Sequence, residues 1–321
     1  MRAALVGVVL LAACSSTNSS GPPPPPAPPP FYVANTGSNT ITVFTTDDTG
    51  NVAPTLTIGG ANTGLDQPQG ILLDATGVLL VTSLNPPRIL VFAAHAVGDV
   101  APIASIVGAN TGLVQPKGLA LDASGRLYVA NAGGNSVLVF ARGASGNVAP
   151  VTTIAGANTA LNGPEGIGLD LHGRLFVTNA LGNSITIFNA GASGNVRPTD
   201  TIVGASTGLN APMGIALDPV GRLYVANSGA GASTSSITVY ASGATGNAAP
   251  IDTIAGTNTA LDQPQGVALD PAGRIYVANS AFTSHLYRIT VYEAGANGNV
   301  VPAVTLAGNN TGLSVPSHLS F

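Results

Sequence analysis

Three short motifs each occur six times between residues 31 and 321, and this repetition limits the fold more than any other feature of the chain. Successive Pro-x-Gly-like steps are separated by 48, 48, 48, 52 and 52 residues. They start at Pro68, Pro116, Pro164, Pro212, Pro264 and Pro316. Tyr-Val-Ala-Asn or a variant starts at Tyr32, Leu80, Tyr128, Phe176, Tyr224 and Tyr276, and Gly-Asn-Val-Ala-Pro or a variant starts at Gly50, Gly98, Gly146, Gly194, Gly246 and Gly298. A period of this length indicates one supersecondary unit stacked or arranged in a ring.

Each unit is predicted to form four strands, as the third repeat illustrates. Its apolar segments 118–122, 127–131, 137–141 and 151–155 are separated by stretches rich in Gly, Ala, Ser, Asn, Asp and Pro. The segments favour β-structure because they are short and rich in β-branched and aromatic residues. No segment has the 3.6-residue period of a helix. The prediction is an all-β, six-bladed β-propeller with four antiparallel strands per blade.

The ends of the repeat region predict how the ring closes. The region begins at Phe31, in a second strand, and ends at 317–321, which aligns with a first strand. The first blade therefore lacks its inner strand, and the C-terminal strand is expected to supply it. Closure of this kind leaves no open edge between the first and last blades.

The repeat resembles NHL repeats through the Pro-x-Gly-Ile/Val-Ala-Leu-Asp and Gly-Arg-Leu/Ile-Tyr-Val-Ala-Asn runs. The stretch 32–43 is similar to YVTN-type propeller repeats. The resemblance covers 31–321 and implies architecture rather than activity, because such propellers include binding modules, sensor domains and a few enzymes, among them the gluconolactonase-like propellers.

The first thirty residues are predicted to be an export signal followed by a tether. An apolar run over 3–11 is too short to span a bilayer and is typical of a signal peptide. Leu11-Ala12-Ala13-Cys14 resembles the lipobox of bacterial lipoproteins, which implies that 1–14 is a lipoprotein signal and lipobox and that Cys14 carries a lipid. The Ser/Pro-rich segment 15–30 is expected to be a tether without fixed structure. The expected location is the bacterial cell envelope, extracytoplasmic and lipid-anchored, in the outer membrane if the organism has one, with the membrane as a partner.

Composition excludes two classes of protein. The ten Lys and Arg residues are scattered, so the chain has no basic patch for nucleic acid. Cys14 is the only cysteine, so the fold has no internal disulfide.

Candidate binding residues lie on one predicted face. The loops between first and second strands repeat an Asp–Arg pair, as in Asp122 and Arg126, which indicates a turn with a local ion pair. The opposite face varies. The middle residues of the six Pro-x-Gly-like steps are expected at the mouth of the central channel: Gln69, Lys117, Glu165, Met213, Gln265 and Ser317. Lys117 and Glu165 are expected to be able to pair. Two interpretations stay open, a polar ligand site and solvated variation at a loop edge.

The two repeats of 52 residues carry their extra residues on the same face. Their loops are 228–236 and 280–288, and the second holds Phe282, His285, Tyr287 and Arg288. Insertions on one face often build a binding surface, for a protein or a small molecule. The other interpretation is that the loop packs over the propeller rim.

No catalytic constellation or metal-site spacing is evident in the sequence. Resemblance to gluconolactonase-like propellers implies a divalent metal at the channel, where Glu165 with Asn179 or Asn227 would supply part of the ligand set. We therefore expect a lipid-anchored, NHL-like binding or scaffold module without a required cofactor. A metal-dependent lactonase- or lyase-like enzyme and a structural surface protein without a small ligand remain as alternatives.

Overall fold

The computed structural model describes residues 28–229, 231–282 and 284–321. The predicted signal peptide, Cys14 and residues 15–27 of the predicted tether lie outside these ranges. Strand β1 begins at Pro30, the residue expected to end the tether, and the Pro29 carbonyl accepts a hydrogen bond from Thr46 N at 3.2 Å. The described residues contain no helix that is long and apolar enough to cross a membrane.

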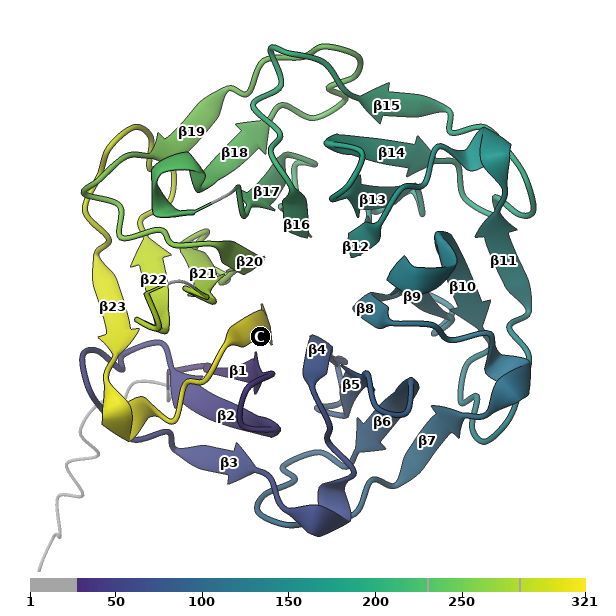
Figure 1. Ribbon diagram of the computed structural model, residues 1–321, viewed down its shortest axis with the longest axis horizontal. Coiled ribbons are helices and arrows are strands. Elements are labelled where there is room, and N and C mark those ends of the chain that lie inside the picture. The colour runs from purple at the N-terminus through teal and green to yellow at the C-terminus, as the bar shows by residue number, and fades with distance from the viewer. Residues whose placement is uncertain (1–27, 230, 283) are drawn as a thin grey trace, which may run out of the picture.

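The described strands form six sheets of four antiparallel strands, arranged as blades around a central axis (Figure 1). The prediction of a six-bladed propeller is confirmed. The innermost strands are β4 Pro68–Leu73, β8 Pro116–Leu121, β12 Pro164–Leu169, β16 Pro212–Leu217, β20 Pro264–Leu269 and β24 Pro316–Ser320. The second strands are β1 Pro30–Asn35, β5 Leu79–Ser83, β9 Leu127–Asn131, β13 Leu175–Asn179, β17 Leu223–Asn227 and β21 Ile275–Asn279.

The third strands are β2 Thr40–Thr45, β6 Arg88–Phe92, β10 Ser136–Phe140, β14 Ser184–Phe188, β18 Ser236–Tyr240 and β22 Arg288–Tyr292. The outer strands are β3 Leu56–Ile58, β7 Ala104–Val107, β11 Thr152–Ala155, β15 Asp200–Ile202, β19 Asp252–Ala255 and β23 Val304–Ala307. Short 3-10 turns lie in the connecting loops: η1 Ala61–Thr63, η2 Ala109–Thr111, η3 Ala132–Gly134, η4 Ala157–Thr159, η5 Ala232–Thr234 and η6 Asn309–Thr311. We number the blades in chain order: β1–β3 with β24 form blade 1, and β20–β23 form blade 6.

The ring closes as predicted. Strand β24 pairs antiparallel with β1, with Tyr32 opposite Ser320 and Val33 opposite Leu319. In Figure 1 the yellow C-terminal strand lies beside the purple first strand. The Phe321 ring, just past β24, packs edge-on against Tyr276 of blade 6, with ring centroids 4.8 Å apart. The last residues thus complete one sheet and also join it to the preceding blade.

The hydrophobic core lies in the seams between blades. Each of the six buried clusters draws its side chains from two neighbouring blades. The seam between blades 6 and 1, for example, packs Phe31 and Val33 with Ala278 and Ile289. No blade buries its apolar faces by itself, so the stability of each depends on both neighbours.

The Gly-Asn-Val-Ala-Pro motif links neighbouring blades at the outer edge. Its glycine pairs with the outer strand of the preceding blade, as Gly98 N donates to the Thr57 carbonyl at 2.7 Å. The next residue accepts from the loop after that outer strand, as Asn147 Oδ1 does from Asn110 N at 2.8 Å. The motif repeats six times because six such joints are needed, which explains it without a ligand.

Deleting 317–321 should lower the melting temperature by roughly 10 °C or more, because it exposes the edge of β1 and removes the packing on Tyr276. Phe321→Ala, which keeps the strand, should cause a smaller loss. Differential scanning calorimetry checks both. Equal melting of the deletion variant and the wild type would contradict closure by β24.

Candidate functional site

The central channel is lined by the innermost strands of all six blades and has a volume of about 410 Å³. Most of the residues that line it have apolar side chains, Ile71, Leu119, Ile167 and Val267 among them, but the exposed wall is divided about equally between polar and apolar atoms. The innermost strands approach closely at the glycine of each Pro-x-Gly step. A Cβ atom at Gly118 would lie 2.7 Å from the Glu165 carbonyl oxygen of the next blade. This contact explains why five of the six steps carry glycine.

At the channel mouth, three predicted site residues form a connected polar chain. Lys117 Nζ lies 3.6 Å from Glu165 Oε2 and donates to Gln69 Oε1 at 3.2 Å. Gln69 Nε2 donates to Thr36 Oγ1 at 3.1 Å. Burial raises the pKa of Glu165, and the charge of Lys117 opposes that rise. The expected Lys117–Glu165 pairing is therefore present, and Gln69 extends it.

The backbone under this chain is held by hydroxyl groups of the second strands. Thr82 Oγ1 donates to the Lys117 carbonyl at 2.9 Å, and Thr178 Oγ1 donates to the Met213 carbonyl. Each of these bonds joins one blade to the next. Lys117 and Met213 therefore project from strand backbone that is bonded to the preceding blade rather than from free loops.

The other predicted mouth residues differ in accessibility. Met213 is partly exposed, and Gln265 is also partly exposed and donates from Nε2 to Ser228 Oγ at 3.2 Å. Ser317 is only 3% exposed, and its hydroxyl donates to the Gln69 carbonyl at 2.8 Å. The Ser317 side chain is therefore covered at the mouth, and it joins the closing strand to blade 2.

The predicted loop residues lie at a separate hollow. His285, Tyr287 and Arg288 line a pocket of about 250 Å³ together with Leu286 and residues 307–309 and Leu313, beyond the end of β23. The His285 and Tyr287 rings meet edge to face at 6.2 Å. Phe282 is 51% exposed. Among the described residues no hydrogen bond or ion pair connects this loop to the Gln69–Lys117–Glu165 chain.

The two asparagines that the gluconolactonase resemblance implies as metal ligands do not fit a metal. Asn179 accepts from Asn162 N and donates to Thr186 Oγ1, so its amide already fastens a loop to its own blade. Asn227 makes the equivalent bonds to Asn210 and Thr238. Both side chains are fully buried. Within the described ranges, no group of three His, Cys, Asp or Glu side chains is placed to hold a metal ion.

The structure adds His318, which the sequence analysis did not include among the candidates. It occupies the step position that is glycine in the other five repeats, and it lines the channel. Both ring nitrogens are buried, and neither forms a hydrogen bond of normal geometry with a described residue, although the Gln69 backbone lies near the ring and opposes the lowering of its pKa. Burial lowers the pKa of His318 to about 4, and the charge of Lys117 adds to the effect. His318 could have been identified from the sequence, because Pro316-Ser317-His318 is the only one of the six Pro-x-Gly-like steps without glycine at its third position.

The turns on the opposite face match their prediction. Arg Nε donates to Asp Oδ2 at 2.6 to 2.7 Å in four blades, through the pairs Asp122–Arg126, Asp170–Arg174, Asp218–Arg222 and Asp270–Arg274. Each is a local turn contact and not a separate site.

Replacing His318 should reduce the acid sensitivity of the fold. Unfolded histidine binds a proton near pH 6.5 but folded His318 only near pH 4. The unfolded state therefore binds more protons between these values, and stability falls as the pH drops through that window. Between pH 7 and pH 5, the melting temperature of the His318→Leu variant should fall less than that of the wild type. The exposed His172→Gln should keep the wild-type slope, and an unchanged slope in His318→Leu would refute the assignment.

No family model matches the chain, and no curated protein matches it. Solved structures do match. The chain is similar to a protein of unknown function from Bacteroides caccae, with 10% identity, 92% of this chain and 98% of that chain covered, and a TM-score of 0.64. It is also similar to a chain of a nidogen–laminin complex, with 14% identity, 91% and 98% coverage, and a TM-score of 0.61.

A third similar structure is a 6-phosphogluconolactonase-like protein from Bacteroides uniformis, with 17% identity, 87% and 83% coverage, and a TM-score of 0.58. At these identities the likeness concerns the fold alone. The comparisons and the sheet topology together establish a six-bladed β-propeller.

Proposed function

We propose that the chain is a lipid-anchored, extracytoplasmic binding module whose partner docks on the face of the channel mouth. One observation carries the proposal: residue identities repeat from blade to blade on one face of the ring and change from blade to blade on the other. The turns opposite the mouth repeat an Asp–Arg pair in four blades, whereas the mouth positions differ in side chain from blade to blade, apart from the repeated glutamine. Variation on a fixed scaffold is how repeat proteins acquire binding surfaces.

The chemistry of the mouth favours a partner with both donor and acceptor groups. Lys117 and Glu165 are each less than a fifth exposed, so a ligand would meet two partly desolvated charges of opposite sign. Such charges orient a partner more strongly than fully hydrated ones. Met213 and the exposed Phe282 offer apolar contact on the same face. The proposal requires no metal ion and assigns no catalytic residue.

The lipid anchor in this proposal is supported by the lipobox-like segment that ends at Cys14. The following Ser/Pro-rich segment would separate the ring from the bilayer. An extracytoplasmic location follows from the signal-peptide-like run. The partner would then belong to the cell envelope or its surroundings.

Cys14→Ser should move the protein from the membrane fraction to the soluble fraction, or leave the precursor uncleaved, because the thiol is the acylation site in the proposal. Metabolic labelling with an alkyne fatty acid should mark the wild type only. A variant that fractionates with membranes and labels like the wild type would exclude Cys14 as the anchor.

Photocrosslinking in intact cells tests the binding face. A photoreactive residue at Met213 or Phe282 should form adducts, read by gel for a protein partner and by intact mass for a small one. The matched controls are Leu171 and Val220, which are exposed on the opposite face, and they should form none. Lys117→Met should reduce the adduct yield at Met213, whereas Arg126→Met should not. Adducts only at Leu171 and Val220, or none at any position, would reject the proposed face.

A further inference from the structure

Blade 2 departs from the turn chemistry of the blades that follow it. In blades 3 to 6 the turn arginine lies over an aromatic ring two residues later, with guanidinium-to-centroid distances of 5.4 to 5.9 Å. These pairs are Arg126–Tyr128, Arg174–Phe176, Arg222–Tyr224 and Arg274–Tyr276. The equivalent positions of blade 2 are Val78 and Leu80. Blade 2 therefore lacks both the cation and the ring.

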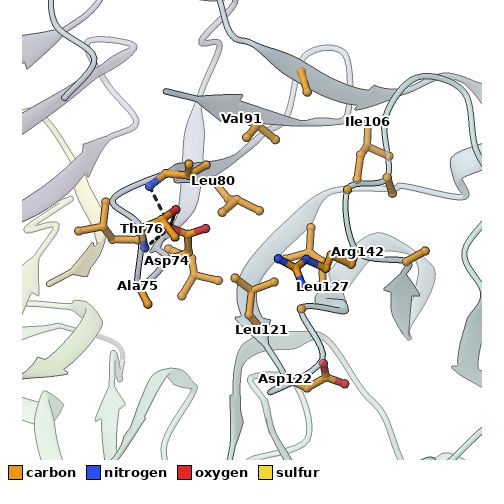
Figure 2. A pocket seen from close by; sticks show the side chains of 18 of the residues that line it. Asp74, Ala75, Thr76, Leu80, Val91, Ile106, Leu121, Asp122, Leu127 and Arg142 are labelled. Carbon is orange, nitrogen blue, oxygen red and sulfur yellow. Dashed lines mark hydrogen bonds between the residues drawn. The ribbon is translucent and has the colours of Figure 1, made fainter. Parts of the chain in front are cut away.

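A cavity of about 640 Å³ lies in the seam between blades 2 and 3, where these groups would have been (Figure 2). Leu72, Val78 and Leu80 line it from blade 2, and Leu121 and Leu127 line it from blade 3. A pocket at the seam between blades 4 and 5, where Arg174 is present, has about 340 Å³. The larger volume is within the range that accepts a small organic molecule.

Asp74 borders this cavity with one carboxylate oxygen that lacks a cation. Its Oδ1 accepts from Thr76 N at 2.8 Å, Thr76 Oγ1 at 2.7 Å and Val78 N at 2.9 Å. In four other blades the remaining oxygen of the turn aspartate binds the arginine Nε. Among the described residues Asp74 has no ion pair, and no side chain donates to its Oδ2. Although burial raises the pKa of Asp74, the hydrogen bonds from Thr76, Val78 and Gly77 outweigh it and lower the pKa, so the group is charged at neutral pH.

Arg142 does not neutralise Asp74. It lines the pocket from blade 3, where its side chain packs on Gly125 of the neighbouring turn. Figure 2 shows its guanidinium in the blade 3 part of the pocket and Asp74 in the blade 2 part. Within the described chain no ion pair joins the two. The carboxylate therefore lies at the blade 2 edge of the pocket, partly exposed and without a protein cation.

We propose that this seam pocket binds a small, flat aromatic cation. Its amidinium or guanidinium group would donate to Asp74 Oδ2, and its ring would lie among Leu80, Leu121 and Leu127. The ligand would supply the cation and the ring that blades 3 to 6 carry as an arginine and an aromatic side chain. A charge-assisted hydrogen bond and burial of one ring would both favour it.

Benzamidine is the probe, with binding measured by isothermal titration calorimetry and by chemical shifts of the Asp74 turn. Wild-type protein should bind it in a saturable manner. The neutral isostere benzamide and the Asp74→Asn variant should each weaken binding by about tenfold or more, because the charged hydrogen bond is lost. The double variant Val78→Arg with Leu80→Tyr should bind none and melt at a higher temperature, because it refills the seam.

Asp218→Asn in blade 5 is the matched control, and it should leave benzamidine affinity unchanged because Arg222 already occupies that turn. If the double variant fails to fold, Leu80→Phe alone should still reduce affinity by filling the ring position. Absence of benzamidine binding to the wild type, or equal binding to Asp74→Asn, would overturn the proposal. Preferential binding of benzoate that is lost in Arg142→Ala would also overturn it, since the pocket would then select an anion. The pocket lies on the face opposite the channel mouth, so neither outcome decides the function proposed above.

Discussion

Every blade of this protein depends on its neighbours, because the hydrophobic core lies between the blades and not within them. A ring built this way is stable only if its first and last blades also meet. The pairing of β24 with β1 meets that requirement, and Phe321 adds packing against blade 6. The repeated outer joints, in which a motif glycine binds the preceding outer strand, fix the spacing of the blades. The central channel and the seams between blades are therefore consequences of ring geometry.

The strands could be predicted from sequence because the responsible signals are local, and the closure because the repeat region begins in a second strand and ends in a first strand. Apolar segments, turn residues and a constant spacing recur in each unit, and six copies reinforce one another. The Asp–Arg turn pairs are four residues apart and were predictable for the same reason. By contrast, Lys117 and Gln69 are 48 residues apart, and their hydrogen bond exists only once adjacent blades are in place. The burial of Ser317 likewise follows from its bond to the next blade.

Departures from the repeat carry the information about candidate sites. His318 replaces a glycine of the innermost strands, and Val78 and Leu80 replace an arginine and an aromatic residue. The sequence shows each replacement, but not its consequence. The burial of the His318 imidazole and the open seam follow only from what surrounds those positions. The predicted loop residues illustrate the reverse case, since His285 and Tyr287 lie on the expected face but at a hollow separate from the Lys117–Glu165 pair.

We propose that repeated segments build the ring and that departures from repetition mark where it binds. Hydrogen–deuterium exchange of the protein on its native membrane, compared with the purified protein, is the decisive measurement. Exchange on the membrane should be slower at the mouth segments around 116–118 and 164–166, with no change in the repeated outer loops such as 143–150. Slower exchange confined to the repeated outer loops would contradict the proposal.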